Sequence, residues 1–113
     1  MKHYPSSNHK QIDSDFCGRL TEVLNVPEQE ISIAVLVDVS HTKAHYHQLS
    51  LEYYWLEEGE LTVRVEDDEV TMKAGDILAI MPGEAHEIVK ASKKNRLIAI
   101  SSPRYTPEDE YEA

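Results

Sequence analysis

The segment 45–59 reads HYHQLSLEYYWLEEG, and the segment 75–86 reads GDILAIMPGEAH. Side chains at positions i and i+2 of a strand point to the same face, so His45 and His47 predict two imidazoles on one side. Glu52 follows five residues later, and His86 comes after two more expected strands. Three imidazoles and one carboxylate form a ligand set that binds a divalent transition metal and can leave coordination positions open for a substrate.

A His-x-His pair by itself also arises by chance, or as a surface pair on an acidic protein. Two further features favour the metal site: the offset of Glu52, and the later turn at Pro82-Gly83 followed by His86. We expect a turn at 48–50, so that Glu52 begins the next strand and faces the same interior as the histidines. The four side chains would then meet within ordinary metal–ligand distances.

Short strands separated by turn residues run through the rest of the chain. Residues 31–38 alternate in polarity with the period of two that is typical of a strand. Further stretches with strand character are 61–65, 77–81, 87–89 and 97–100. Turns are expected at 58–59, 66–69, 75–76 and 82–83, where glycine, proline and acidic residues gather. Many short strands at this spacing predict an all-β sandwich or barrel.

Alternation along the strand that begins near Glu52 separates an inner from an outer face. Tyr54 would face inward with Glu52, whereas Tyr53 and Trp55 would face outward. Tyr54 is therefore our candidate catalytic residue, because its phenol could assist proton transfer or orient a substrate oxygen. The alternative role for Tyr54 is core packing with one hydrogen bond.

A single domain fits a chain of 113 residues, and an apolar share of 41% suffices for a packed interior without disulfides. We expect a domain at 16–105 between a polar N-terminal arm, 1–15, and an acidic flexible tail, 106–113. The arm is either loose or an edge strand against a partner subunit. One cysteine, Cys17, favours a reducing compartment, and the polar start of the chain shows no signal peptide, which together predict a soluble cytoplasmic protein.

The formal net charge of −10 excludes nucleic acid as a partner, since binding it requires a cationic face. The one basic cluster is better explained as a solvated loop than as a phosphate site, and comprises Lys90, Lys93, Lys94 and Arg96. The longest apolar stretch, 31–39, is too short to span a bilayer. The expected partner is therefore a small-molecule ligand or substrate, with neither nucleic acid nor a membrane involved.

The two quoted segments resemble the paired motifs of the cupin family. The first motif is a glycine, five residues, His-x-His, three or four residues, a glutamate, six residues and a glycine; it is matched by His45, His47, Glu52 and Gly59. The second is a glycine, five residues, Pro-x-Gly, two residues, a histidine, three residues and an asparagine; it is matched by Gly75, Gly83 and His86. The chain thus resembles a small single-domain cupin over about 31–103.

Three positions depart from the family pattern, and none of them is a metal ligand in the family: Val39, Met81 and Lys90. The resemblance implies an antiparallel jelly-roll β-barrel of six to eight strands with a metal inside near one mouth. It also implies that His45, His47, Glu52 and His86 are the ligands. Cupins hold manganese, iron, nickel, copper or zinc, and this ligand set does not distinguish among them.

Three functional classes follow from the resemblance. The first is an enzyme that uses the metal as a Lewis acid on a small oxygenated metabolite (a sugar, sugar acid or keto acid), of the isomerase or lyase type. The second is a metal-dependent dioxygenase, and the third is a non-catalytic cupin that binds a small molecule. The fold alone does not choose among them.

Exposed strand edges and an apolar outer sheet face predict a homodimer, to which the N-terminal arm would contribute. The candidates for that outer face are Tyr53, Trp55 and Leu36. Cupins are commonly dimers, which supports the same expectation.

Overall fold

The computed structural model describes all 113 residues and contains strands and two short 3₁₀ turns but no α-helix. In chain order the elements are η1 Ser6–Asn8, β1 Lys10–Ser14, β2 Gly18–Leu24, β3 Ser32–Val37, β4 His45–Tyr46, β5 Leu51–Glu58, β6 Glu60–Val65, β7 Asp68–Lys73, β8 Ile77–Ile80, β9 His86–Ala91, β10 Arg96–Ser102, η2 Pro107–Asp109 and β11 Tyr111–Glu112. Short strands therefore occupy the stretches in which the sequence predicts them.

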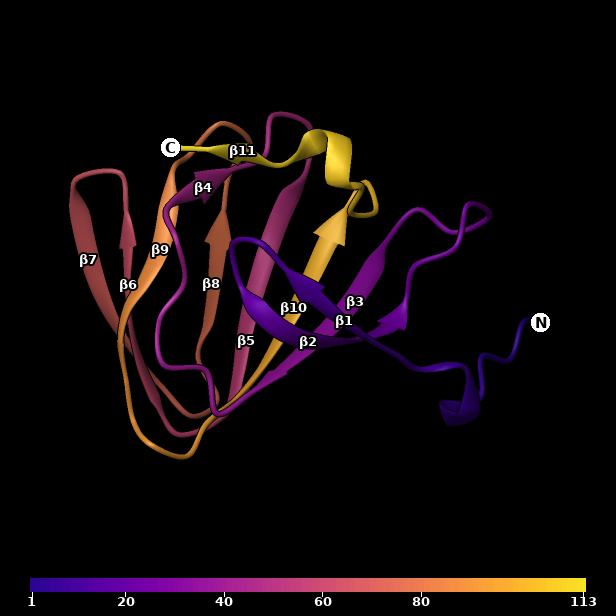
Figure 1. Cartoon of the computed structure of the whole chain (residues 1–113), viewed down its shortest axis with the longest axis horizontal. Coiled ribbons are helices and arrows are strands. Elements are labelled where there is room, and N and C mark those ends of the chain that lie inside the picture. Colours follow the sequence, from indigo (N-terminus) through magenta and orange to yellow (C-terminus); the bar gives the residue numbers. More distant parts are fainter.

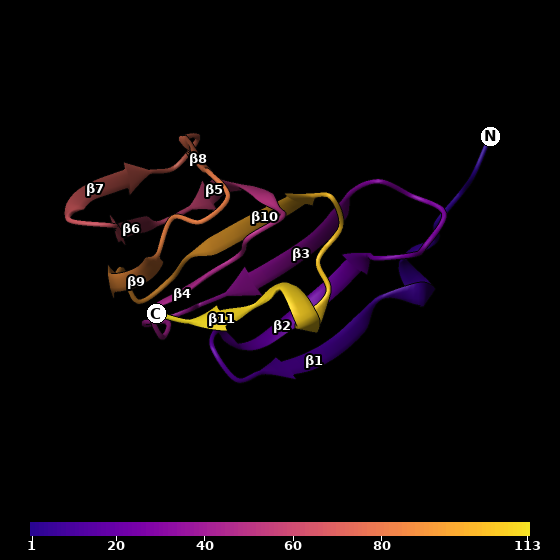
Figure 2. The same cartoon turned by 90° about the horizontal axis from the view of Figure 1, so that it is seen from above.

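The strands form two antiparallel sheets that face each other (Figures 1 and 2). The six-stranded sheet has the order β1-β2-β3-β10-β5-β8, and the five-stranded sheet has the order β11-β4-β9-β6-β7. Neighbours in these orders are often distant in sequence, as in a jelly roll, and backbone hydrogen bonds do not join the two sheets into a closed ring. The predicted all-β jelly-roll fold is confirmed.

Apolar side chains fill most of the space between the two sheets. The buried cluster comprises Leu36, Val39, Tyr54, Leu56, Leu61, Val63, Met72, Ile80, Ile88, Leu97 and Ala99. Burying each large side chain contributes about 1.5–3 kcal/mol to folding by removing it from water. This cluster holds the two sheets together and sets the position of the strands that carry the histidines.

Strand β5 has the two faces that alternation predicts. Tyr54 and Leu56 are buried between the sheets, whereas Tyr53 and Trp55 are 36% and 42% exposed on the outside. The inward face of β5 also carries Glu52, which is buried. A single strand thus supplies both a core side chain and a candidate metal ligand.

Leu36 on β3 does not belong to the outer sheet face, contrary to the expectation from sequence. It pairs with Leu97 of β10, which in turn pairs with Leu56 of β5, and all three are buried in the core. Its neighbour Val37 is 56% exposed instead. Both faces of this strand are largely apolar, so the alternation alone does not reveal which one points inward.

The C-terminal segment, 106–113, carries regular secondary structure where the sequence suggested a flexible tail. After the η2 turn, β11 pairs with β4, so that Tyr111 lies opposite Tyr46 and their rings stack 5.1 Å apart. In Figure 1, η2, β11 and β4 lie together at one end of the molecule. The acidic composition suggested solvation, but hydrogen bonds to a distant loop, described below, hold the segment in place.

One third of the N-terminal arm forms part of the sheet. Residues Lys10–Ser14 make β1, which pairs along its whole length with β2 of the same chain and ends the six-stranded sheet. The sequence left open a loose arm or an edge strand against a partner subunit, and the structure shows an edge strand that pairs within its own chain. No helix in the structure has the length and apolar character needed to cross a membrane. The cytoplasmic location stays a prediction.

Gly59, which closes the first motif, sits in a tight turn between β5 and β6. Its φ of +89° lies in the region that favours glycine. A Cβ at this position would lie 2.6 Å from the Ser92 hydroxyl oxygen and 2.8 Å from the Asn95 Cβ. The turn therefore requires glycine both for its backbone angle and for space.

Candidate metal centre

Three buried histidines meet at the end of the molecule where β4 and β9 pair. His45 lies on β4 directly opposite His86 on β9, and His47 follows β4 by one residue. One side-chain atom from each of the three lies within 4.8 Å of the others. Ligands at about 2.1 Å from a shared ion lie about 3.4–4.2 Å apart, so small side-chain adjustments bring these nitrogens to one cation.

Each of the three imidazoles is held at its Nδ1 atom by a backbone carbonyl. The Nδ1 atom of His45 lies 2.7 Å from the Lys43 carbonyl, that of His47 lies 2.9 Å from the Asp109 carbonyl, and that of His86 lies 3.0 Å from the Glu84 carbonyl. A carbonyl can only accept, so each Nδ1 carries the hydrogen and donates it. Each Nε2 is then left with a free lone pair, as in histidines that bind metals.

Glu52 faces two of the three histidines. Its Oε1 atom lies 3.2 Å from the Nε2 of His86 and 3.9 Å from the Nε2 of His47. Burial acts to raise the pKa of the Glu52 carboxyl, but the adjacent His86, with the other two histidines, outweighs burial and lowers it. Glu52 is therefore ionised at neutral pH, as a metal ligand must be.

The surroundings of His45 and His86 shift their pKa values in opposite directions. Burial, followed by the charge of His86, lowers the pKa of His45 to about 4, so His45 is neutral at pH 7. Burial also acts to lower the pKa of His86, but the neighbouring Glu52 outweighs it and raises the pKa. A proton thus competes with a metal for His86 at higher pH than for His45.

Three buried polar atoms at the centre of this cluster have no hydrogen-bond partner: the Nε2 atoms of His47 and His86 and the Oε1 atom of Glu52. Folded proteins rarely leave buried polar atoms unpaired, and each one costs about 1–3 kcal/mol. A cation bound between the two imidazole lone pairs and the carboxylate would satisfy all three. The residues present therefore fit the metal that the ligand pattern implies.

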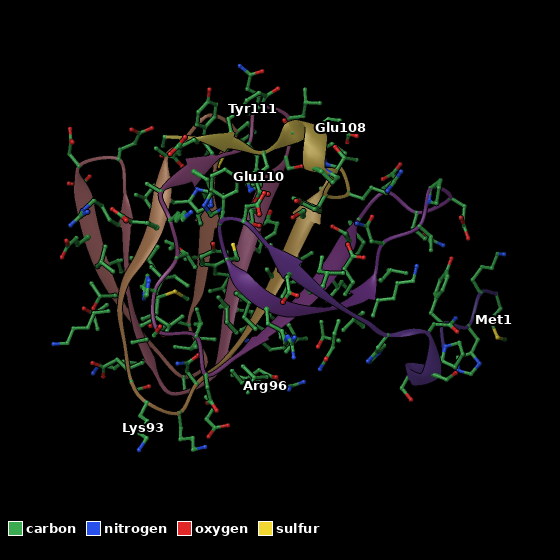
Figure 3. The ribbon with its side chains drawn as sticks, viewed as in Figure 1. Met1, Lys93, Arg96, Glu108, Glu110 and Tyr111 are labelled. Atoms are coloured by element: carbon green, nitrogen blue, oxygen red, sulfur yellow. The ribbon has the colours of Figure 1, made fainter.

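Glu110 also reaches this centre, and the sequence analysis did not find it. Its Oε2 atom lies 3.9 Å from the Nε2 of His45, and its Oε1 atom accepts a hydrogen bond of 2.8 Å from the Tyr105 hydroxyl. In Figure 3, Glu110 lies on the interior side of the C-terminal segment, whereas Glu108 and Tyr111 lie on its outer side. Burial raises the pKa of its carboxyl in the absence of a cation.

Asp109 links the C-terminal segment to the loop between His47 and Glu52. Its carboxylate accepts hydrogen bonds of 3.0–3.1 Å from the backbone N–H groups of Gln48, Leu49 and Ser50. Its own backbone carbonyl accepts the Nδ1 hydrogen of His47. The only local sign in the sequence is Thr106-Pro107-Glu108-Asp109, which has the composition of a helical turn start. Nothing in that pattern names the distant loop as its partner.

Tyr54 and Cys17 lie at the edge of the cluster. The Tyr54 ring stands edge-on to His86 at 6.0 Å, and burial, then the charge of Glu52, raises the pKa of its phenol well above the usual range. The Cys17 sulfur lies 4.0 Å from the Nε2 of His45, and burial raises the pKa of its thiol to about 12. Both groups are therefore neutral at pH 7 and line the space beside the histidines.

A small cavity of about 60 Å³ adjoins the cluster, between the six-stranded sheet and the C-terminal segment. Its lining includes His45, His47, Glu52, Tyr54 and Glu110. A space of this size holds a few water molecules or the oxygen-bearing end of a small ligand. The arrangement can therefore bring a small molecule to a bound cation.

Solved structures with the same fold include several named enzymes. A variant of the Streptomyces protein Pac13 with uridine has a TM-score of 0.84 and 13% identity, covering 100% of this chain and 91% of that one; Pac13 is described as a nucleoside dehydratase. KdgF from Halomonas has a TM-score of 0.76 and 15% identity, with 96% and 98% covered. Oxalate decarboxylase from Bacillus subtilis has a TM-score of 0.79 and 13% identity, with 95% of this chain but 30% of that one covered.

These identities are low, so the likeness establishes the fold alone. No curated protein matches the sequence. The sequence model of the Cupin domain matches residues 35–102, a range that contains all four ligands expected from the motifs. That range exceeds half of the chain, and together with the two facing antiparallel sheets it shows that this protein belongs to the cupin family.

Proposed function

We propose that this protein binds a divalent transition metal through His45, His47, His86 and Glu52 and acts on a small oxygenated metabolite by isomerase or lyase chemistry. The observation that carries the proposal is the convergence of the three imidazoles and one carboxylate, with three of their buried atoms unpaired. A metal held here supplies a Lewis acid that polarises a carbonyl or hydroxyl oxygen. Manganese, iron, nickel, copper and zinc all suit this ligand set.

The residues of the chain contribute orientation and a proton donor. The carbonyls that hold each Nδ1 keep the imidazoles fixed, so the open side of the site keeps its shape when a ligand enters. The raised pKa of Tyr54 keeps its phenol protonated at neutral pH. We assign Tyr54 the role of donating a hydrogen bond to a substrate oxygen at the cavity wall, and its replacement by phenylalanine would remove that donor alone.

Two of the similar proteins support the lyase class over the oxygenase class. Pac13 is called a dehydratase and the Bacillus subtilis protein a decarboxylase, and both names describe the removal of a small molecule from a substrate. A metal-dependent dioxygenase and a non-catalytic binding protein are the alternative functions for the same four ligands.

Metal identity and oxygen uptake distinguish these functions. The protein is purified without added metal, its metal is measured by elemental analysis, and a panel of small sugars, sugar acids and keto acids is screened with and without oxygen. We expect manganese, nickel or zinc and anaerobic turnover that falls in Tyr54→Phe. Iron with oxygen consumption would establish the dioxygenase instead, and binding without product would establish the passive binder. A wild type with no more metal than His86→Ala would refute the metal site itself.

We further propose that the protein is a homodimer, joined through the outer face of the six-stranded sheet. Trp55 pairs with Ile77 on one side and with Ile98 on the other, and Trp55 and Ile77 are 42% and 62% exposed. Copies with a net charge of −10 repel one another, so an uncharged apolar face is where two can meet. Light scattering at micromolar concentration is expected to give twice the monomer mass for wild type and the monomer mass for Trp55→Lys.

A further inference from the structure

The cavity beside the histidines carries negative charge and no fixed positive charge. Of the 17 residues that line it, three bear carboxylates, Glu22, Glu52 and Glu110, and none is a lysine or arginine. Most binding sites for carboxylates or phosphates supply at least one such cation, because a buried anion requires a paired charge. The lining of this cavity therefore bears directly on the kind of molecule that can enter.

Two of these carboxylates face different histidines of the same cluster. Glu52 lies 3.2 Å from His86, whereas Glu110 lies 3.9 Å from His45. A divalent cation bound by the histidines would bring two positive charges. The carboxylates of Glu52 and Glu110 balance these two charges, and Glu22 adds a third negative group to the lining, so the site has no net positive charge to attract an anionic ligand.

Contacts from three parts of the chain fix the position of Glu110. The Tyr105 hydroxyl donates a hydrogen bond of 2.8 Å to one carboxylate oxygen of Glu110. On one side of Glu110, Asp109 is hydrogen-bonded to the loop at 48–50. On the other side, Tyr111 pairs with β4. Glu110 is half-buried and lines the cavity, while Glu108 of the same segment is exposed (Figure 3). The charge of Glu110 is therefore a built feature of the cavity wall.

We propose that this site accepts an uncharged, hydroxyl- or carbonyl-bearing molecule, such as a neutral sugar or polyol, and that Glu110 is the specificity-determining residue that rejects carboxylates and phosphates. The inference rests on the proposed metal site and narrows its substrate class, leaving sugar acids and keto acids out. Glu110 acts by charge and needs no bond to the metal to do so.

The test uses the full chain loaded with Co²⁺, whose visible absorption bands report both the ligands and any molecule that joins them. Acetate serves as the anionic probe and imidazole as the neutral one, and each is titrated into wild type, Glu110→Gln and Glu108→Gln. Glu110→Gln removes one negative charge from the wall of the cavity that acetate would enter. We expect this change to tighten acetate binding by about tenfold or more. Imidazole affinity is expected to stay within about twofold, and Glu108→Gln to match wild type for both probes.

Each other outcome overturns a separate part of the argument. Equal acetate affinity in wild type and Glu110→Gln would refute the role of Glu110 while leaving the metal site intact. Loss of the cobalt bands in Glu110→Gln but not in Glu108→Gln would make Glu110 a metal ligand and contradict a role by charge alone. No cobalt bands in wild type would remove the proposed function and this inference with it.

Discussion

The space between the two sheets has an apolar end and a polar end, and the same strands serve both. Along the inward face of β5, Glu52 is followed by Tyr54 and then by Leu56. The antiparallel strand β10 shows the same change from polar to apolar residues. Its Ser101 lies opposite Glu52, and its Leu97 lies opposite Leu56. One set of strands therefore builds a hydrophobic core at one end and a candidate metal centre at the other.

The two ends treat buried polar groups differently. At the apolar end, the buried Asn95 side chain accepts a hydrogen bond from the Val39 N–H and donates to the carbonyls of Val39 and Ser92. At the polar end, buried atoms of His47, His86 and Glu52 have no partner. Stability comes from the first end, whereas the second carries an electrostatic cost that a bound cation would remove.

The largest expected effect on stability comes from a cavity-creating substitution at the apolar end. Leu56 is fully buried, so Leu56→Ala removes core contacts and leaves a cavity, at a cost of about 2–5 kcal/mol in the free energy of unfolding. Denaturant unfolding measures this cost, and Leu49→Ala, at a 68% exposed site, is the matched control. The metal content of the folded fraction should not change. If the metal content falls together with the stability, the apolar and polar ends are coupled and do not serve separate purposes.

Acid should weaken the polar end of the metal-free protein. The pKa of His45 lies near 4 instead of its ordinary 6.5, so the unfolded chain binds more protons between these values. The contribution of neutral His45 is therefore complete above pH 6.5 and is lost as the pH falls toward 4, by up to about 3 kcal/mol. Unfolding measured in EDTA from pH 7 to 4.5 should show a steeper decline for wild type than for His45→Gln.

The comparison with His45→Gln is needed because other groups titrate beside His45. The raised pKa of His86 stabilises the folded state below pH 6.5, and the lowered pKa of Glu52 withdraws stability only below about pH 4.5. Both remain in the variant. Parallel pH profiles for the two proteins would show that protonation of His45 does not cause the loss of stability in acid.

A bound metal should remove the cost at the polar end. At a free Zn²⁺ concentration one hundred times its Kd, wild type should gain about 2.7 kcal/mol of stability, and His86→Ala should gain almost none. Thermal unfolding with and without Zn²⁺ measures the gain, and His41→Ala, which removes an exposed histidine, is the control. Equal gains in wild type and His86→Ala would place the metal elsewhere on this acidic chain.

The convergence of the four candidate ligands could be predicted from the sequence because local rules bring these side chains together. Alternation places His45 and His47 on one face, and turn residues return the chain so that Glu52 and His86 reach the same point. The inward face of β3 could not be predicted, since Leu36 and Val37 are both apolar. The direction of that face depends on pairing with β10, in which Leu36 lies opposite Leu97, 61 residues later in the chain.

The C-terminal segment could not be predicted for a different reason. Its acidic composition carries no apolar periodicity, so nothing local indicates order. Asp109 finds its partners 59 to 61 residues earlier, in N–H groups that a turn leaves free. Order there is a consequence of the finished fold, and the carboxylate of Glu110 comes to the site with it.

Asp109 provides the smallest and most discriminating of these tests. Asp109→Asn keeps the size of the side chain but replaces one acceptor oxygen by a donor that faces backbone N–H groups. We expect a loss of about 1–2 kcal/mol in unfolding and a metal affinity lower by about tenfold, because the loop between His47 and Glu52 loses its support. Denaturant unfolding and Co²⁺ titration measure the two effects, with Glu112→Gln, at an exposed site, as control.

The cobalt absorption bands decide what kind of residue Asp109 is. If it positions ligands, the bands of Asp109→Asn shift even when the site is saturated, since His47 and Glu52 then bind in altered geometry. If it only ties down the tail, stability falls while the saturated spectrum and the affinity match wild type. The first result would show that the C-terminal segment, which lies outside the family motifs, helps to set the geometry of the polar end. The second would confine the centre to residues 45–86.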